Sequence, residues 1–262
     1  MSNFGYAGKI LRADLSSGSI EMIPTSEYAD RFLGGRGIAA KVSWDEVPPE
    51  VGAFDEGNRL IFATGPLCGL PVLGSSRWEV CGKSAYTTPE HFNYCNMGGK
   101  WGAYLKFAGY DAVIVQGKSE KPVYLLLKEN AAEIKDASAL WGKGAIETRE
   151  SLKRETGKSA KIVGVGPAGE NMTVFASLQA DNDASGGGGL GATMGSKRLK
   201  AIVVASEKKK VAVAHPERLR ELTKYYLNLK SQRITYKTDY FFHKDVPSEM
   251  RPNLFKTKMK QR

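Results

Sequence analysis

The sequence predicts an α+β fold whose sheets are largely antiparallel. Segments that alternate apolar and polar residues, as half-buried strands do, outnumber segments with helical periodicity. The first two of them, residues 9–15 and 20–23, flank the turn-forming run 16–19 and therefore indicate a β-hairpin. Regular alternation of strand and helix, which is typical of a doubly wound nucleotide-binding fold, does not occur.

The remaining elements follow from the same patterns. Further strands are predicted at residues 59–64, 77–82, 112–117, 122–127, 161–165, 173–180 and 201–205, and helices at residues 30–44, 101–107 and 145–156. An amphipathic helix is predicted from Pro216, because Leu219, Leu222, Tyr225 and Leu229 recur at helical spacing. We therefore expect one domain over residues 1–210, and a helix with a basic tail, the start of a further helical domain, over residues 211–262.

The composition is typical of a globular protein with a substantial core. Of the 262 residues, 42% are hydrophobic and 25% are charged. Apolar runs fall far short of the roughly 20 residues that span a bilayer, and the N-terminus lacks an export signal, so we expect a cytoplasmic protein that does not bind membranes. The spacing of Cys68, Cys81 and Cys95 favours reduced thiols over a disulfide framework or a compact zinc site.

The formal charge of +10 is concentrated at one end of the chain. Residues 196–262 hold 18 of the 38 lysines and arginines but only 6 of the 28 acidic residues, so residues 1–195 are close to neutral. A nucleic-acid-binding domain spreads its basic residues over a face of the fold and interleaves them with stacking aromatics. Nucleic-acid binding through the basic tail is therefore the weakest of the functional alternatives.

Glycine is enriched, with 29 residues, and is concentrated in loops at residues 65–77, 96–102 and 184–197. Glycine lets the backbone approach a ligand, and successive N–H groups bind phosphate, so three such loops favour a phosphorylated cofactor over simple tight turns. The phosphate loop of nucleotide hydrolases does not occur in the sequence, and Gly189-Leu190-Gly191 lacks the third glycine of a dinucleotide fingerprint in register. These absences argue against a nucleotide hydrolase and against a nicotinamide cofactor.

The sequence gives little support to nucleophilic or metal-only catalysis. It has three histidines, His91, His215 and His243, and no Gly-x-Ser-x-Gly elbow, which argues against a hydrolase. His91 and Cys95 stand four residues apart, but they would supply only two ligands to a metal. We expect a packing or loop role for both.

The blocks around the glycine loops resemble the N-terminal domain of the tungsten-containing aldehyde ferredoxin oxidoreductase family. The similarity covers about residues 5–215 and includes the blocks at residues 8–12, 33–37, 63–67, 98–102, 106–112, 136–138, 140–143, 166–171 and 191–197. The resemblance implies two β-sheets that form the base on which a tungsten bis-pterin cofactor sits. Helical domains further along the family's chain cover the cofactor.

The resemblance also assigns cofactor-binding residues by position. Arg77 matches an arginine that lies between the pterin and a [4Fe-4S] cluster, and its charge suits the cofactor's anionic groups. Asn96 and Gly98 match the first pterin loop, and Ala184 and Gly186 match the second. By position, the Asn96 side chain and the Ala184 backbone carbonyl inherit a Mg²⁺ that links the two pterin phosphates, and oxygen ligands suit this cation.

Two positions of the second loop depart from the family pattern. Asp183, which we also assign to the cofactor site, and Gly187 stand where the family usually carries arginines. Negative charge in place of positive weakens a phosphate contact unless another residue, such as Lys100 or Lys197, compensates. The resemblance assigns no catalytic residue and does not choose between tungsten and molybdenum.

Three functions stay open. The first is the tungstopterin-binding part of an iron–sulfur-linked oxidoreductase that oxidises aldehydes to carboxylic acids with ferredoxin as acceptor. Residues 93–102 and 181–186 look closer to the tungsten subunit of class II benzoyl-coenzyme A reductases, which makes a fragment of that subunit the second. The third is a non-catalytic pterin-binding scaffold.

The iron–sulfur part of such an enzyme has no counterpart in this sequence. The family's Cys-x-x-Cys-x-x-x-Cys motif does not occur, so we expect no [4Fe-4S] ligands here and no turnover by the chain alone. The resemblance implies that missing C-terminal domains or a complementary polypeptide complete the site. It implies as partner a ferredoxin or an iron–sulfur electron-transfer subunit, and a homodimer stays open.

Overall fold

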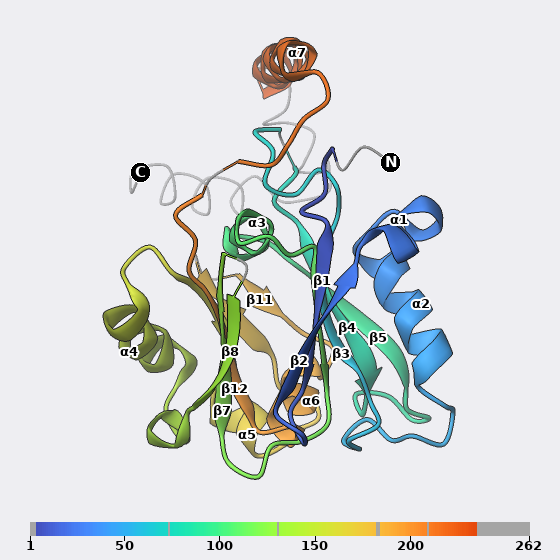
Figure 1. Ribbon diagram of the computed structural model, residues 1–262, viewed down its shortest axis with the longest axis vertical. Coiled ribbons are helices and arrows are strands. Elements are labelled where there is room, and N and C mark those ends of the chain that lie inside the picture. Colours follow the sequence, from blue (N-terminus) through green and yellow to red (C-terminus); the bar gives the residue numbers. More distant parts are fainter. Residues whose placement is uncertain (1–3, 73, 130, 182–183, 209, 235–262) are drawn as a thin grey trace, which may run out of the picture. The chain divides into compact units, whose positions relative to one another are not determined.

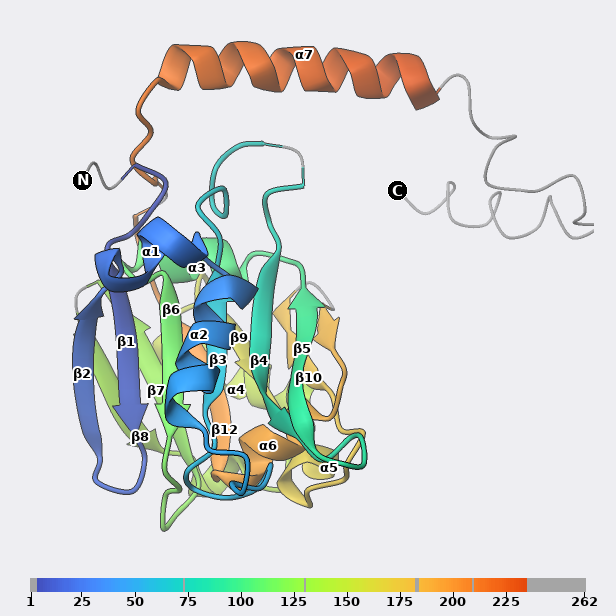
Figure 2. The ribbon, with the colours of Figure 1, turned by 90° about the vertical axis from the view of Figure 1, so that its right-hand side faces the viewer.

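The computed structural model describes residues 4–72, 74–129, 131–181, 184–208 and 210–234 (Figures 1 and 2). The chain divides into two compact units, residues 1–214 and residues 215–262. The first unit contains two six-stranded sheets, and the described part of the second contains helix α7 (Pro216–Ile234). The predicted C-terminal helix is therefore confirmed, and the basic tail beyond it lies outside the described residues.

The first sheet has the strand order β2-β1-β6-β3-β4-β5. Its strands are β1 (Lys9–Asp14), β2 (Ser19–Pro24), β3 (Leu60–Thr64), β4 (Trp78–Ser84), β5 (His91–Met97) and β6 (Ala112–Gln116). β1 and β2 form the predicted hairpin, β1 and β6 are parallel, and the other neighbours are antiparallel. This order places β4 and β5 together at one edge of the sheet.

The second sheet has the strand order β11-β10-β9-β12-β7-β8. Its strands are β7 (Val123–Lys128), β8 (Ala131–Asp136), β9 (Lys161–Gly164), β10 (Leu178–Ala180), β11 (Ser185–Gly186) and β12 (Leu199–Val204). β7 and β12 are parallel, and the other neighbours are antiparallel. Both sheets are therefore mixed with largely antiparallel pairing, which confirms the predicted α+β class.

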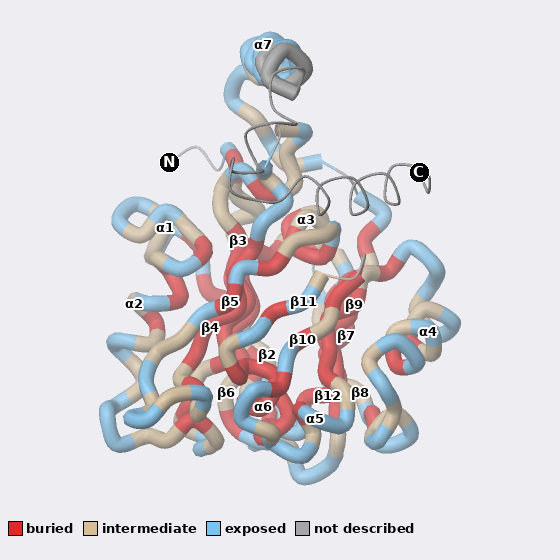
Figure 3. The backbone as a smooth tube through the Cα atoms, turned by 180° about the vertical axis from the view of Figure 1, so that it is seen from behind, coloured by how far each residue is buried: buried red, intermediate tan, exposed pale blue. Residues whose placement is uncertain are grey.

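The two sheets pack face to face around the main core. Phe62 and Trp78 from the first sheet join Leu125 and Ile202 from the second in one cluster of buried side chains, and the buried strands stand out in Figure 3. The burial of apolar surface between the sheets, which contributes roughly 25 cal/mol per Å², is the main force that holds the two layers together.

Helices cover the outer faces of both sheets. The helices of the first unit are α1 (Ser26–Phe32), α2 (Arg36–Glu46), α3 (Trp101–Phe107), α4 (Ala145–Thr156), α5 (Pro167–Glu170) and α6 (Leu190–Ser196), with a short 3₁₀ turn at Ser138–Leu140. α1 and α2 pack on the first sheet and α4 packs on the second (Figures 1 and 2). Within the described residues, no helix is long and apolar enough to cross a membrane.

Two sequence predictions need correction. The helix predicted at residues 30–44 is two helices, α1 and α2, because Leu33, Gly34 and Gly35 all take positive φ angles between them. The strand predicted at residues 173–180 is reduced to β10, and its first residues form turns whose Phe175 side chain is 70% exposed. In both places local turns interrupt a continuous hydrophobic pattern.

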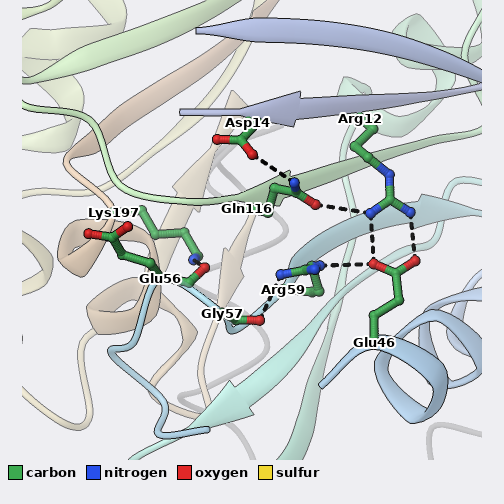
Figure 4. Close-up of polar contacts among 8 residues, drawn as sticks. All are labelled: Arg12, Asp14, Glu46, Glu56, Gly57, Arg59, Gln116 and Lys197. Carbon is green, nitrogen blue, oxygen red and sulfur yellow. Dashed lines mark hydrogen bonds and ion pairs between the residues drawn. The ribbon is translucent and has the colours of Figure 1, made fainter. Parts of the chain in front are cut away.

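A network of partly buried charges ties α2 to the first sheet (Figure 4). Glu46 at the end of α2 accepts two hydrogen bonds from Arg12 on β1, at 2.6 and 2.7 Å, and one from Arg59 at 2.9 Å. Arg12 also donates to Gln116 on β6, whose amide donates to Asp14. The two arginines lower the pKa of the Glu46 carboxyl, although its burial acts in the opposite direction and is the largest single effect.

Replacing Glu46 with alanine tests how much this network stabilises the fold. Glu46→Ala leaves two arginines with side chains only 16% exposed without their carboxylate, so we expect the free energy of unfolding to fall by about 2–3 kcal/mol. The matched control is Asp45→Ala, which breaks the exposed pair with Lys41 on the same helix and should change stability by less than about 0.5 kcal/mol. Urea denaturation measures both, and equal effects would contradict the proposed role.

Lys197 is buried where α6 ends, at the end of the first sheet opposite the start of β4. Its side chain is 1% exposed, and Nζ donates to the backbone carbonyls of Gly117, at 3.2 Å, and Glu56, at 3.4 Å. Burial lowers the pKa of the Lys197 ammonium to about 8, and the charge of Arg59 acts in the same direction. The protonated form is therefore disfavoured in the folded state relative to the unfolded chain.

This burial predicts a stability that rises with pH. Between pH 8 and the ordinary lysine pKa of 10.5, the unfolded chain binds more protons at this position than the folded chain, so the free energy of unfolding increases with pH. Between pH 7.5 and 9.5 the increase for the wild type should exceed that for Lys197→Met by about 1–2 kcal/mol. If the free energy of unfolding depended on pH in the same way for the wild type and Lys197→Met, the Lys197 ammonium would not be disfavoured in the fold.

Candidate functional site

Two glycine loops that lie far apart in the sequence meet at one edge of the sheets. Gly99, after β5, has φ +78°, and a Cβ placed on it would lie 2.8 Å from the carbonyl oxygen of Asp181 and 3.5 Å from Cβ of Ala184. A Cβ on Gly186 would lie 2.5 Å from Sγ of Cys95. Only glycine permits this approach, so the structure brings together the two loops that the resemblance identifies as pterin loops.

Asn96 lies on β5 directly opposite Glu79 on β4. The Asn96 side chain is exposed, and its Nδ2 donates a hydrogen bond of 2.8 Å to Oε1 of Glu79. Glu79 is only 8% exposed, and Nε of Arg36 lies 3.9 Å from the same oxygen. Burial raises the pKa of the Glu79 carboxyl, whereas the hydrogen bond from Asn96 and the charges of Arg36 and Arg77 act in the opposite direction.

The side chain of Trp78, the residue after Arg77, links the Gly98 loop to helix α3. Nε1 of Trp78 donates a hydrogen bond of 2.8 Å to the carbonyl oxygen of Gly98, and the Trp78 and Trp101 rings lie 4.4 Å apart between centroids. Gly102 passes so close to Trp78 that a Cβ there would lie 2.8 Å from its ring. The exposed Arg77 guanidinium packs over Gly98, with Nη1 3.3 Å from the position of a Cβ.

A pocket of about 260 Å³ opens beside these loops. It is lined by residues 33–37, by residues 63, 65 and 66 at the end of β3, and by residues 77–79 at the start of β4. Arg36, Arg77 and Glu79 therefore face one pocket, and they are its ionisable lining residues among those that the structure describes. Four glycines in the lining leave their backbone accessible to a ligand.

The second glycine loop differs from the first in the groups that it could present to a cofactor. The carbonyl oxygen of Ala184 accepts the backbone N–H of Ala180 at 2.7 Å, and a carbonyl oxygen has a second lone pair that can ligate a cation. Gly186 is buried in β11, and Gly187 is exposed with open space where a side chain would be. Asp183 lies outside the described residues.

The residue that compensates for the missing arginines is not Lys197. Lys197 is buried and hydrogen-bonded to the carbonyls of Gly117 and Glu56, at the opposite end of the first sheet from Asn96. Lys100 is exposed and directly follows the Gly98–Gly99 turn, so it remains the candidate.

His91 and Cys95 do not form a metal site together. His91 is exposed and its Nδ1 lies 2.7 Å from Oγ1 of Thr87, while Cys95 is buried four residues further along β5. Burial raises the pKa of the Cys95 thiol to about 12 and that of Cys68 to about 11. Within the described residues, no group of three or more His, Cys, Asp or Glu side chains gathers as metal ligands.

The sequence prediction missed Glu79 and gave Arg36 no role. Glu79 is a charged residue in the apolar first half of β4, between Trp78 and Val80. A carboxylate placed there faces a buried environment that disfavours its charge. A charged residue among apolar ones could therefore have marked Glu79 as a candidate. Its hydrogen-bond partner, Asn96, becomes evident only from the strand register.

The donor set fits a phosphorylated cofactor with a hard cation. The amide oxygen of Asn96 and the carbonyl oxygen of Ala184 are the ligand type that Mg²⁺ prefers. Arg77 offers a fork of donors to anionic oxygens, and the absence of a side chain at Gly98 lets its guanidinium lie close to the backbone of the first loop.

Comparison with known proteins identifies relatives of this chain. Residues 10–206 match the family described as aldehyde ferredoxin oxidoreductase, N-terminal domain. A tungsten-containing aldehyde ferredoxin oxidoreductase of Pyrococcus abyssi is 46% identical over 209 residues, which cover 79% of this chain and 34% of that protein. The aliphatic sulfonate oxidoreductase, WOR-like subunit, of Pyrococcus furiosus is 34% identical over 220 residues, covering 76% of this chain and 34% of that protein.

A solved structure is similar over most of the chain. It is the active site complex BamBC of benzoyl-coenzyme A reductase in complex with 1,5-dienoyl-CoA, which matches with a TM-score of 0.84 and 42% identity. The match covers 88% of this chain and 35% of the other. The present chain thus spans about a third of the length of these relatives.

The two-sheet base and its paired glycine loops, together with these identities, define the N-terminal domain of an oxidoreductase. The chain belongs to the aldehyde ferredoxin oxidoreductase family. Its fold is the one that the resemblance implied, with two sheets as the base.

Replacing Gly99 with alanine tests the contact between the two loops. Gly99→Ala combines a positive φ with a Cβ 2.8 Å from a backbone oxygen, so we expect the free energy of unfolding to fall by about 2–4 kcal/mol. Gly18→Ala is the control, because it has φ +73° but nothing within 4 Å of the added Cβ, and it should cost about 1 kcal/mol. Equal losses in chemical denaturation would show that the loops are not in close contact.

Proposed function

We propose that the chain is the tungstopterin-binding part of an iron–sulfur-linked oxidoreductase that oxidises aldehydes to carboxylic acids. Its membership of the family and its 46% identity to a tungsten-containing aldehyde ferredoxin oxidoreductase support this proposal. The observation that carries it is the meeting of two loops 88 residues apart, from Asn96 to Ala184, which contact each other through Gly99. Three free, buried cysteines agree with a cytoplasmic location.

In this proposal the two loops hold the cofactor from both sides. Asn96 and the Ala184 carbonyl oxygen would hold the Mg²⁺ of the cofactor, and Gly98 and Gly186 would shape the loops around it. Asp183, which we also assign to this site, lies outside the described residues. When bound, the metal of the cofactor, tungsten or molybdenum, supplies the electron-transfer chemistry that no side chain here offers.

The side chains around the loops set the electrostatics of the site. The Arg77 guanidinium, fixed over Gly98, stabilises anionic groups of the cofactor. Trp78 and Trp101 form an apolar floor that excludes water below the loop, which strengthens the charge interactions above it. Lys100 adds positive charge where the second loop lacks arginine.

In this proposal, the iron–sulfur ligands and the substrate pocket belong to parts of the enzyme other than this chain. The chain spans about a third of its relatives, and its three cysteines lie in separate segments and are buried. We therefore assign the [4Fe-4S] ligands and the substrate pocket to further domains or to a complementary polypeptide, with ferredoxin or an iron–sulfur subunit as electron acceptor. The chain alone should show no turnover, and a homodimer remains compatible with this arrangement.

A second candidate is the tungsten subunit of a benzoyl-coenzyme A reductase. The similarity to the BamBC complex, at 42% identity over 88% of the chain, favours it. Assays on the protein purified with its complementary polypeptides separate the two, because benzaldehyde-dependent viologen reduction supports the first candidate and 1,5-dienoyl-CoA-dependent reduction supports the second. Cofactor binding without either activity would favour a non-catalytic pterin scaffold.

Substitution of Asn96 tests the cofactor site directly. For Asn96→Ala, expressed in the native host, we expect tungsten (or molybdenum) and pterin per polypeptide to fall about tenfold, because a cation ligand is lost. Asn171→Ala is the control, because Asn171 is exposed and hydrogen-bonds only locally to Pro167. Unchanged metal and pterin in Asn96→Ala would contradict the assignment of this loop.

A further inference from the structure

The inner face of β5 lies against the second glycine loop. Cys95 and Met97 alternate on this face and belong to the main core cluster. A Cβ on Gly186 would lie 2.5 Å from Sγ of Cys95 and 2.9 Å from Sδ of Met97. Asn93 precedes Cys95 by two residues and therefore lies on the same face, where its Nδ2 is 3.0 Å from the position of a Cβ on Gly188. The second loop therefore runs along this face of β5.

Two side chains converge on the carbonyl oxygen of Gly188, near the end of this loop. Oγ of Ser84, a residue that is 1% exposed and ends β4, donates a hydrogen bond of 2.6 Å to this oxygen. Nδ2 of Asn93 donates a second one, of 3.1 Å, while its Oδ1 accepts the backbone N–H of Tyr94 at 2.8 Å. A carbonyl oxygen has two lone pairs, and each has a donor here. The Gly188 carbonyl is therefore an anchor of the loop and not a further cation ligand.

The anchor holds a segment that has little conformational preference of its own. Residues 186–189 are four consecutive glycines, and glycine loses more conformational freedom on ordering than any other residue. Gly188 and Gly189 take φ angles of +70° and +74°. Contacts from outside the segment are therefore needed to select one conformation of the loop, and the two hydrogen bonds to Gly188 supply them.

Both ends of the second loop are thus fixed by β5 and the residues around it. At one end, a Cβ on Gly99, which follows β5, would lie 3.5 Å from Cβ of Ala184. At the other end, Asn93 of β5 binds the Gly188 carbonyl. Gly186, to which the resemblance assigns a cofactor contact, lies between these two anchors. Because β5 also leads into the first loop, one strand sets the position of both loops.

We propose that Asn93 and Ser84 are positioning residues, which hold the second glycine loop in the conformation that binds the cofactor. This inference rests on the proposed cofactor site and adds to it the side chains that order the loop before the cofactor binds. Both residues act through the Gly188 carbonyl, and no direct contact with the cofactor is assigned to them. Because the glycine segment is already ordered, binding costs less conformational entropy.

A purely structural role, in which the Asn93 side chain only fills space beside the loop, predicts a different response to substitution. Asn93→Asp keeps the shape of the side chain and the oxygen that accepts the Tyr94 N–H, but it replaces the donating NH₂ group with an oxygen that only accepts. Asn93→Gln keeps the amide donor. If the hydrogen bond to Gly188 matters, Asn93→Asp should therefore be impaired and Asn93→Gln should not.

The first test needs no cofactor. Hydrogen–deuterium exchange followed by mass spectrometry measures how fast the backbone N–H groups of residues 186–190 exchange in the full chain. We expect this exchange to be about tenfold faster in Asn93→Asp and Ser84→Ala than in the wild type, and within about threefold of the wild type in Asn93→Gln. Unchanged exchange in both Asn93→Asp and Ser84→Ala would overturn the inference, whatever the site binds.

The second test measures how fast the protein, purified from its native host with its copurifying polypeptides, releases its cofactor. Released pterin is oxidised and measured by its fluorescence after dilution. We expect Asn93→Asp to release pterin about tenfold faster than the wild type and Asn93→Gln to stay within about threefold of it. Asn171→Asp is the matched control, because it makes the same chemical change at an exposed residue that hydrogen-bonds only locally to Pro167.

The outcomes separate this inference from the proposed function. If the wild type carries neither pterin nor its metal, the proposed cofactor site is wrong and the positioning role falls with it. If the wild type carries pterin and Asn93→Asp releases it as slowly, the site stands and the positioning role is overturned. If Asn93→Gln releases pterin as fast as Asn93→Asp, the fit of the side chain and not its hydrogen bond holds the loop, which also overturns the inference.

Discussion

The packing of Trp78 between the two sheets is the constraint on which the site depends. Its ring lies against Trp101 and Phe62 in the main core, while its indole N–H reaches out to the carbonyl of Gly98. The same residue therefore belongs to the core and fixes the first glycine loop, which we propose binds the cofactor. Because Arg77 directly precedes Trp78, the first residue of β4, and Glu79 follows it, the burial of Trp78 also determines where both charges lie.

The close approach of the two loops follows from glycine at Gly99 and Gly186, where any side chain would overlap the other loop. The same close packing at a glycine occurs in α6, where a Cβ on Gly195 would overlap the backbone of α5. Glycine enrichment in this chain thus reflects close backbone packing as well as ligand access, and the two explanations hold for different positions. At the opposite end of the first sheet, the Glu46 network stabilises the fold without contributing to the site, and buried Lys197 lies equally far from the site.

Much of the fold was predictable because its periodicity is local. Helices α3 and α4 have the predicted bounds, and the hairpin and most central strands follow their apolar runs. The pattern failed at β5, where two asparagines weaken the strand signal, and at α6, where two glycines lower helix propensity but tertiary packing overrides it. The loop residues Arg77, Asn96 and Ala184 came from family resemblance, whereas Glu79 required the β4–β5 register, which no local pattern encodes.

The central claim is that the loops of Asn96 and Ala184 together hold a metal-bearing pterin. The most direct measurement is X-ray diffraction from crystals of the anaerobically purified native protein, with its copurifying polypeptides, collected on both sides of the tungsten L₃ edge. The account predicts an anomalous difference peak near the two loops, on the side where Arg77 overlies Gly98. A tungsten peak elsewhere, or these loops filled by protein side chains in the complete assembly, would contradict it.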